Sequence, residues 1–336
     1  MAEFGCPYMG SKGPLAKWVL SKIPKQEHIY DLFGGGFAIS HCAVMSEKWK
    51  NVHYNEIQKD VTELVKDAIA GKYSSERFKP EWISRFEFHR RKSEEAYIRY
   101  VWSFGNNGKG YLFSEDLEVL KRSMHDAVVF GRFDDTFISL FGFKSWGPLV
   151  SIKDRRLYIR KVIAHKNLKQ TDKLRSEQLE RLQQLERLQQ LQQLQQLERL
   201  QGLEHVNPAR LHITSLDYRE VPIKKESVIY CDPPYANTAS YSKDGFDHDS
   251  FYEWARDSKH PIFISEYSMP EDFKVIASMS KVEKLSPSKT KKSSPSKTKK
   301  SYFETIFANK LGYEMYMDTK AGIVKPKTVL RQREEL

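Results

Sequence analysis

Apolar and polar positions follow two different periods along the first part of the chain. The apolar run 28–33 (HIYDLF) predicts a short buried strand that ends at three consecutive glycines. The next nine residues, FAISHCAVM, predict a helix, and residues 51–54 predict a second strand. Amphipathic periodicity predicts further helices over 14–23 and 58–70. This order of strand, glycine turn, helix and strand is typical of the front half of a doubly wound, nucleotide-binding sheet.

The same pattern returns in the second half of the chain. Apolar runs at 211–217, 227–231 and 261–265 predict strands, and 280–285 with 302–308 predict a hairpin. We therefore predict an α/β protein of Rossmann-like topology, whose sheet domain comprises residues 1–75 and 205–325.

The segment between these two halves differs in character. Residues 76–170 are basic and aromatic, and they predict an inserted, mostly helical domain. The glycine-rich piece GNNGKG at 105–110 lies within it, and its Asn and Gly residues favour the positive φ angles of a tight hairpin turn.

Two low-complexity segments interrupt this organisation. Leucine recurs at every third position from Leu179 to Leu203, within a segment (171–204) whose composition favours helix. A three-residue step slips by about 60° around an α-helix, so the leucines cannot keep one face toward one partner. We predict a largely exposed helical arm, either a dimerisation arm or a length-variable insertion. Residues 286–301 contain two copies of SPSKTKKS, which predict a flexible, solvated loop.

The positive charge is concentrated in two places. The 336-residue chain has a net charge of +11, from 55 Lys and Arg against 44 Asp and Glu. Residues 76–170 carry 19 basic and 12 acidic residues, and the duplicated loop adds six lysines. Such clusters suit a polyanion such as nucleic acid, although lysine-rich loops also simply aid solubility.

Cysteine spacing and hydropathy limit the class of protein further. Cys6, Cys42 and Cys231 are far apart and predict neither a disulfide scaffold nor a metal site, so we expect a cytoplasmic protein without a metal. No apolar run approaches the length of a membrane-spanning helix, so we expect no membrane partner.

The strongest chemical motif is Asp232-Pro233-Pro234-Tyr235, directly after the apolar run SVIYC. Open α/β sheets bind ligands at the carboxyl ends of their strands. The two prolines have no backbone N–H, which leaves carbonyl and carboxylate acceptors that suit an amino group with two hydrogens. Tyr235 offers a flat face for stacking on a base. A proline turn with a capping aspartate is the structural alternative.

The ordered series of motifs resembles the Dam-like (D12 class) DNA adenine-N6 methyltransferases, especially phage and prophage members. The series comprises Tyr8/Gly10/Lys12, the DLFGGG turn, Asn55-Glu56, the insert with FGNNGKGYLF, Asp217-Tyr218, DPPY and IFISEYSMPEDF. The resemblance implies a Rossmann-like methyltransferase sheet that uses S-adenosylmethionine, with residues 76–170 as the target-recognition domain. It implies S-adenosylhomocysteine as the product and double-stranded DNA as the partner.

The resemblance also implies roles for individual residues. Asp232, Pro233, Pro234 and Tyr235 are then catalytic. The sequence departs from the family at Ser11, at Glu56 and in the turn, where the last glycine falls on Phe37 or the turn is one residue short, with Gly36 in that role. The implied cofactor contacts are Tyr8, Gly10, Lys12, Asp31, Phe33, Gly34, Gly35, Gly36, Glu56, Asp217, Tyr218 and Asp232.

The implied reaction is methylation of adenine N6 by in-line displacement, on a base flipped out of the duplex. Tyr241 and Phe246 either line the pocket or belong to the core. Basic residues of the insert are candidate phosphate contacts, and two asparagines could reach base edges. The candidate DNA-binding residues are Arg90, Arg91, Lys92, Asn106, Asn107, Lys109, Lys121 and Arg122.

Two alternatives remain open from the sequence, one within enzymes and one outside them. One is a methyltransferase for RNA or a protein amide, and the other is a catalytically degenerate DNA-binding module, which Phe37 motivates. We expect a monomer or weak dimer in a bacterial host cell, encoded by a phage or prophage. The target sequence (GATC is a guess from the family) and a restriction partner cannot be read from the chain.

Overall fold

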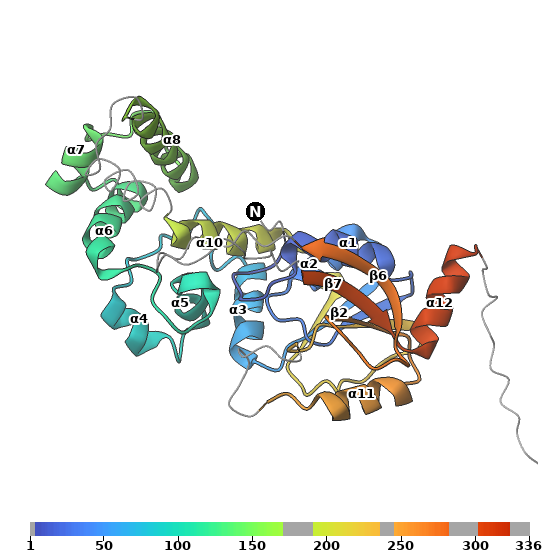
Figure 1. Ribbon diagram of the computed structural model, residues 1–336. Coiled ribbons are helices and arrows are strands. Elements are labelled where there is room, and N and C mark those ends of the chain that lie inside the picture. The colour runs from blue at the N-terminus through green and yellow to red at the C-terminus, as the bar shows by residue number, and fades with distance from the viewer. Residues whose placement is uncertain (1–3, 171–190, 236–244, 282–301, 323–336) are drawn as a thin grey trace, which may run out of the picture. The chain divides into compact units, whose positions relative to one another are not determined.

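The computed structural model describes residues 4–170, 191–235, 245–281 and 302–322 (Figure 1). The chain forms two compact units. Unit 1 comprises residues 1–4, 12–62 and 206–336, and unit 2 comprises residues 5–11 and 63–205. The chain therefore leaves unit 1 within one helix, α3 (Lys59–Ile69), and re-enters it after His205.

Unit 1 is built on a mostly parallel sheet with the strand order β3-β2-β1-β4-β5-β7-β6. The first five strands of this order are parallel, and β7 runs antiparallel to both β5 and β6. The strand order reverses between β1 and β4, which makes the carboxyl ends of these two strands the expected ligand site. The strands are β1 (His28–Asp31), β2 (Asn51–Asn55), β3 (Leu211–Thr214), β4 (Ser227–Cys231), β5 (Ile262–Glu266), β6 (Lys274–Lys281) and β7 (Tyr302–Ala308).

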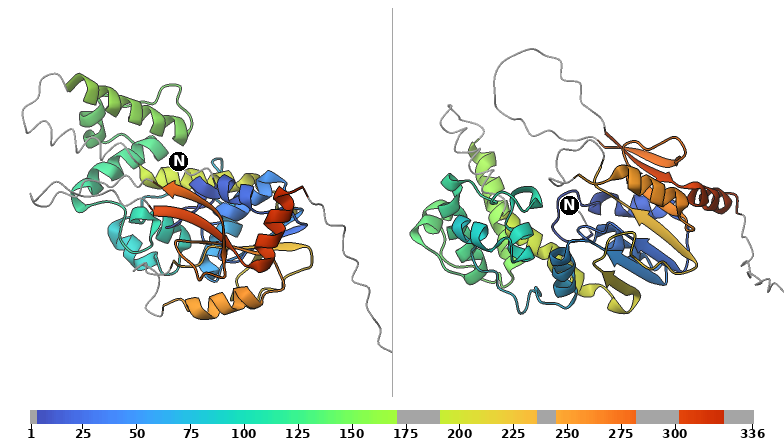
Figure 2. Two further views of the ribbon diagram at one scale, coloured as in Figure 1. Left: turned by 45° about the vertical axis from the view of Figure 1, so that its right-hand side comes forward. Right: turned by 90° about the horizontal axis from the view of Figure 1, so that it is seen from below.

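Helices cover both faces of this sheet (Figures 1 and 2). Tyr30 packs in one hydrophobic cluster with Phe251 of α11 (His248–Asp257). Successive side chains of a strand point to opposite faces, and Asp31 accordingly accepts a hydrogen bond from Ser40 of α2 (Ala38–Ser46) on the other face. The short 3-10 helix η1 (Gly13–Leu15) leads into α1 (Ala16–Lys22), which packs on α2, and α12 (Lys310–Lys320) packs along β5, β6 and β7.

The predicted elements of unit 1 agree with the structure. The α/β class is confirmed, and the strands predicted at 28–33, 51–54, 211–217, 227–231 and 261–265 are β1 to β5. The predicted hairpin is β6 with β7, but β6 begins at Lys274 rather than at residue 280. The start of β6 was missed because the alternation of apolar and polar residues is interrupted there. The strand has a bulge between Val275 and Ala277, and it is a partly polar edge strand.

Among the described residues of unit 2, the regular elements are helices, joined by turns and loops, with one isolated bridge between Ser103 and Tyr111. Its short 3-10 helices are η2 (Phe104–Asn106) and η3 (Gly202–His205). Besides the second part of α3, its α-helices are α4 (Arg85–Arg91), α5 (Ala96–Val101), α6 (Glu115–Phe130), α7 (Asp135–Phe141), α8 (Ile152–Gln170) and α10 (Gln192–Gln201).

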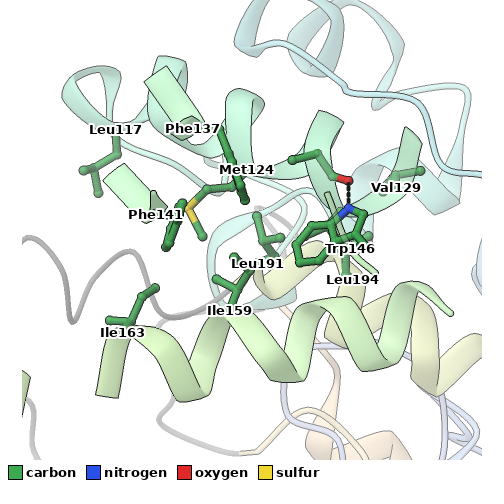
Figure 3. Packing of buried hydrophobic residues seen from close by; sticks show 12 residues of the cluster. Leu117, Met124, Val129, Phe137, Phe141, Trp146, Ile159, Ile163, Leu191 and Leu194 are labelled. Atoms are coloured by element: carbon green, nitrogen blue, oxygen red, sulfur yellow. Dashed lines mark hydrogen bonds between the residues drawn. The ribbon is translucent and has the colours of Figure 1, made fainter. Parts of the chain in front are cut away.

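Unit 2 has a hydrophobic core of its own. Side chains of α6, α7, α8 and α10 meet in one cluster, with Met124, Phe137 and Ile163 at 0% exposure (Figure 3). Trp146 is buried against this cluster, and its indole N–H donates to the carbonyl of Ala127 at 2.7 Å. This cluster is distinct from the hydrophobic cluster that packs on the sheet of unit 1.

The leucine repeat contributes to this core, and the prediction of a largely exposed arm is wrong for residues 191–203. Leu194, Leu197, Leu200 and Leu203 are each at most 2% exposed. The leucines point in successive directions around α10, and they can all be buried because α10 packs on α5 as well as on the cluster. The helix η3 then follows α10 with about three residues per turn, which matches the spacing of the leucines. Arg156 of α8 and Glu198 of α10 add a half-buried ion pair at 2.9 Å. Residues 171–190 lie outside the described residues, as does the duplicated loop 286–301.

Within the described residues, no helix is both long and apolar enough to cross a membrane.

Replacing Leu197 by alanine should lower the free energy of unfolding by about 2–5 kcal/mol, because it leaves a cavity beneath α10. Chemical denaturation followed by circular dichroism measures this change. Gln195→Ala on the same helix is the matched control and should cost less than about 1 kcal/mol, since Gln195 is only half-buried. Equal, small effects of both substitutions would show that α10 is not part of the core.

Candidate active site

The DPPY motif lies where the strand order reverses. Asp232 follows β4 directly, and Asp31 ends β1, the neighbouring parallel strand. The register pairs Asp31 with Tyr230, so the two aspartates leave the sheet at the same edge. This is the position at which open α/β sheets bind ligands, as the motif predicts.

Lys12 joins this motif to β7. Its ammonium lies 2.8 Å from Oδ1 of Asp232 and 3.4 Å from Oε1 of Glu304. The three side chains are 11%, 18% and 5% exposed, so the cluster is largely shielded from water. Burial alone lowers the pKa of Lys12, but the two carboxylates raise it, and the net pKa is above the ordinary value for lysine.

Tyr235 is held from two directions. Its hydroxyl donates to Oε1 of Glu304 at 2.6 Å, and its ring packs edge-on against Tyr267, with centroids 4.6 Å apart. The ammonium of Lys12 lies 4.6 Å from the ring centroid. Burial, followed by the charges of Asp232 and Glu304, raises the pKa of Tyr235, so it stays a neutral donor. The ring is therefore fixed in place before any ligand arrives.

The glycine turn after β1 is closely packed. A Cβ on Gly34 would lie 2.2 Å from the ring of Tyr54 and 3.1 Å from the carbonyl of Asn55, so only glycine fits. Gly35 and Phe37 have positive φ angles of 44° and 65°. Phe37 thus adopts the backbone conformation that glycine usually takes, as an ungapped match to the family implies, and its side chain is fully buried.

Glu56 closes the turn from β2. Its Oε2 accepts the backbone N–H of Gly35 at 2.8 Å, and its Oε1 accepts that of Gln58 at 2.9 Å. Burial raises the pKa of Glu56. The two backbone hydrogen bonds act in the opposite direction, but the net pKa is above the ordinary value for glutamate. The carboxylate therefore lies directly beside the glycine turn, as expected of a ribose-binding acid.

Asn55 fastens the ends of three strands together. Its amide nitrogen donates to the carbonyls of Leu32 and Leu216 at 3.1 and 3.0 Å. Its Oδ1 accepts from the hydroxyl of Thr214 at 2.8 Å and from the backbone N–H of Leu216 at 3.0 Å. The side chain is 1% exposed, so each of these bonds is made in the interior.

Asp31 is buried with one oxygen satisfied. Its Oδ2 accepts from the hydroxyl of Ser40 at 2.7 Å, whereas Oδ1 has no hydrogen-bond partner. Burial, opposed by the Ser40 hydrogen bond and assisted by the charge of Asp232, raises the pKa of Asp31 to about 7. An unpaired buried carboxylate oxygen at a strand end is an acceptor available to a ligand.

Of the two predicted residues after β3, Tyr218 contacts the glycine turn through one aromatic ring. The ring of Tyr218 lies 5.2 Å from that of Phe33, and Phe246 packs against both rings as part of the hydrophobic cluster. Phe246 is partly buried, so both alternatives, pocket lining and core, stay open for it. Asp217 forms a two-pronged ion pair with Arg219 at 2.8 Å, which lowers the pKa of Asp217.

The other predicted cofactor residues divide between the units. Lys12 belongs to unit 1, but Tyr8 and Gly10 belong to unit 2. The ring of Tyr8 packs at 5.3 Å from that of Tyr100, and Gly10 has a φ of 78°. Tyr241 lies outside the described residues.

The glycine-rich loop of unit 2 forms a small closed turn. Phe104 and Gly110 form a backbone hydrogen bond beside the Ser103–Tyr111 bridge. Both predicted base-reading asparagines hold this loop: the amide of Asn106 donates to the carbonyl of Tyr100, and Oδ1 of Asn107 accepts from the N–H of Lys109. Their side chains are thus engaged within the loop, which presents Lys109 and Phe104 to solvent instead.

The predicted basic contacts of unit 2 differ widely in exposure. Arg90 pairs with Glu87, and Arg91 pairs with Glu81 and Glu95, whereas the ammonium of Lys92 donates to the carbonyl of Lys109. Arg122 is 66% exposed, 3.9 Å from Asp126.

Lys121 does not meet the expectation of a phosphate contact. It is 1% exposed and lies over the ring of Phe113, and burial lowers its pKa to about 7. A buried ammonium of this kind cannot reach a phosphate without unfolding its surroundings, so we leave Lys121 out of the DNA contacts.

The sequence pattern did not single out two residues of interest. Glu304 could have been noticed as the acidic residue inside an otherwise apolar and aromatic strand, YFETIFA. Phe104, which is 66% exposed beside the Ser103–Tyr111 bridge, carries no signal in the sequence that distinguishes it from a core aromatic.

The fold and the site together define a class. The mostly parallel sheet with an antiparallel β7, and an acid-Pro-Pro-aromatic motif after β4, fit a methyltransferase. The model of the family described as D12 class N6 adenine-specific DNA methyltransferase matches residues 8–127. The match over these residues supports a Dam-like protein and indicates an adenine-specific DNA methyltransferase. Among curated proteins, none matches the chain.

In the described part of the chain, no group of three or more His, Cys, Asp and Glu side chains is arranged to hold a metal ion.

Substituting Gly34 by alanine should disrupt the turn, because the new methyl group would overlap the Tyr54 ring and crowd a backbone carbonyl. We expect a loss of about 1–3 kcal/mol in stability, measured by thermal unfolding. Gly202→Ala is the control, since Gly202 has a helical φ and nothing lies within 4 Å of a Cβ there. The packing described for Gly34 is contradicted by a G34A protein as stable as the wild type.

Proposed function

We propose that this protein transfers a methyl group from S-adenosylmethionine to N6 of an adenine flipped out of duplex DNA. The observation that carries the proposal is the Asp232 carboxylate, followed by the two prolines without an N–H, beside the fixed ring of Tyr235 at the carboxyl end of β4. The family match to residues 8–127 supports the same substrate.

The residues at the strand ends fit the cofactor. The glycine turn after β1 lets the backbone approach a ligand closely, and Glu56 places a carboxylate beside it for ribose hydroxyls. The unpaired Oδ1 of Asp31 offers a further acceptor within the same edge of the sheet. S-adenosylmethionine, when bound, would supply an activated methyl group on a sulfonium.

Asp232 and Pro233 would prepare the adenine nitrogen. The N6 lone pair is delocalised into the ring, which makes it a poor nucleophile. A carboxylate oxygen of Asp232 and the carbonyl of Pro233 would accept hydrogen bonds from the two N–H groups of N6. These hydrogen bonds would direct the lone pair toward the methyl donor. The Asp232 carboxylate would then take the proton that N6 loses as the new carbon–nitrogen bond forms. Tyr235 would stack on the base and hold its plane.

Asp232→Ala should abolish methylation while cofactor binding largely survives. Loss of the acceptor should lower the rate at least about 100-fold, because it removes both the hydrogen bond and the base. Transfer of radiolabelled methyl groups to duplex DNA measures the rate, and calorimetry with S-adenosylmethionine measures binding.

The carboxylate Asp272 provides a matched control, since it is exposed and pairs only with Arg256 among the contacts observed. Asp272→Asn should keep the wild-type rate. Normal turnover of purified Asp232→Ala would overturn the assignment. Failure of the wild-type protein to bind millimolar cofactor would instead favour a catalytically degenerate DNA-binding module.

Unit 2 would supply the contacts to duplex DNA. Residues 76–170 carry seven more basic than acidic residues, and the loop between Ser103 and Tyr111 presents the cation of Lys109. Phe104 in the same loop has its ring largely in solvent, where an aromatic side chain can stack on an unpaired base. We assign phosphate contacts to the exposed cations Lys109, Arg122 and Arg90, and target recognition to this helical segment.

Lys109→Ala should weaken DNA binding and reduce the slope of log K against log salt by about one, since one phosphate contact is lost. Fluorescence anisotropy with a labelled duplex at several salt concentrations gives this slope. Lys320→Ala in α12 of unit 1 removes the same charge and serves as the control. The assignment of the loop fails if both variants show the same slope as the wild type.

A further inference from the structure

Glu304 occupies an unusual position for an acidic residue. It lies in β7, where the next two residues, Thr305 and Ile306, are buried. The Glu304 residue itself is 4% exposed. One of its oxygens, Oε1, accepts the Tyr235 hydroxyl at 2.6 Å and lies 3.4 Å from the Lys12 ammonium. A buried carboxylate costs several kcal/mol to desolvate, so its retention in a strand calls for a reason other than packing.

We propose that Glu304 is a positioning residue for methyl transfer, which orients Tyr235 and shares Lys12 so that Asp232 stays an effective acceptor. This inference rests on the proposed function. Glu304 does not touch the reacting atoms. It acts through Tyr235, which would stack on the base, and through Lys12, which contacts Asp232, and it comes from a strand almost seventy residues after the DPPY motif.

The first part of the role is geometric. A charge-assisted hydrogen bond of 2.6 Å fixes the Tyr235 hydroxyl, and the edge-on contact with Tyr267 fixes the ring from another side. Together they leave the ring few alternative orientations. A stacking ring that is already oriented saves the free energy of ordering it when the adenine enters.

The second part is electrostatic. One ammonium, Lys12, faces the two carboxylates of Asp232 and Glu304, so the cluster keeps a surplus of one negative charge. Without Glu304, Lys12 would neutralise Asp232 alone, and the carboxylate would attract the adenine N–H bonds more weakly. A buried surplus of negative charge also suits a cationic methyl donor.

The charges that face Asp232 give this part a measurable signature. Burial raises the pKa of Asp232, Lys12 lowers it, Glu304 raises it, and a hydrogen bond from Tyr235 lowers it. Asp31, Tyr230 and Cys231 are the other titratable groups whose charges couple to Asp232. Removing the charge of Glu304 therefore lowers the pKa of Asp232, and the acid limb of kcat/KM should move to lower pH.

The test compares Glu304→Gln with Glu304→Ala. Glutamine keeps an oxygen acceptor for Tyr235 but carries no charge, whereas alanine removes both. We expect Glu304→Ala to lower kcat by about 10- to 100-fold and Glu304→Gln to recover much of that loss. Both variants should shift the acid limb of kcat/KM to lower pH. Glu314→Gln in α12, an exposed carboxylate, is the matched control and should change neither quantity.

Two further measurements keep the outcomes distinct. Tyr235→Phe leaves Glu304 in place and should lower kcat in the wild type, with little further loss in the Glu304→Ala background. Carboxyl-¹³C NMR titration of Asp232 in wild type and Glu304→Gln reads the change in pKa without any turnover. Wild-type kcat and an unshifted profile in both Glu304 variants would overturn the role of Glu304. An inactive wild-type enzyme would instead refute the proposed function.

Discussion

One lysine shared by two buried carboxylates holds the candidate active site together. Lys12 lies directly before η1, Asp232 follows β4, and Glu304 belongs to β7. The strand order makes this possible, because β5 alone separates β4 from β7 in the sheet. Both ion pairs are shielded from water, so removing Lys12 would leave two carboxylates without a counter-charge in the interior, which is strongly destabilising.

The chemistry of the site follows from what the backbone lacks as much as from what the side chains supply. Prolines at 233 and 234 remove two N–H donors from the strand end, which leaves the backbone there with carbonyl acceptors. On the other side of the strand reversal, Gly34 and the left-handed Phe37 turn the chain tightly enough to place Gly35 against Glu56. The proline segment after β4 and the tight glycine turn after β1 thus lie at the same edge of the sheet.

The sequence predicted the elements whose signals are local. The runs HIYDLF and SVIYC are apolar, short and bounded by glycine or proline, and both form strands as expected. The partners of these strands were not predictable in the same way. Glu304 meets Lys12 only because β7 inserts antiparallel between β5 and β6, which no local pattern states. The three-residue spacing of the leucines predicted that most of them would be exposed. They are buried along α10 because this helix is packed on more than one side. The sequence likewise predicted Lys121 as a surface charge, whereas its position in α6 places it inside unit 2.

In the proposed reaction, adenine in duplex DNA receives the methyl group. The direct measurement incubates the purified full chain with unmethylated duplex DNA and S-adenosylmethionine carrying a deuterated methyl group, digests the DNA to nucleosides, and analyses these by mass spectrometry. We expect labelled N6-methyldeoxyadenosine as the product. Label in methylcytosine, or no label in the DNA although the cofactor binds, would contradict this reaction.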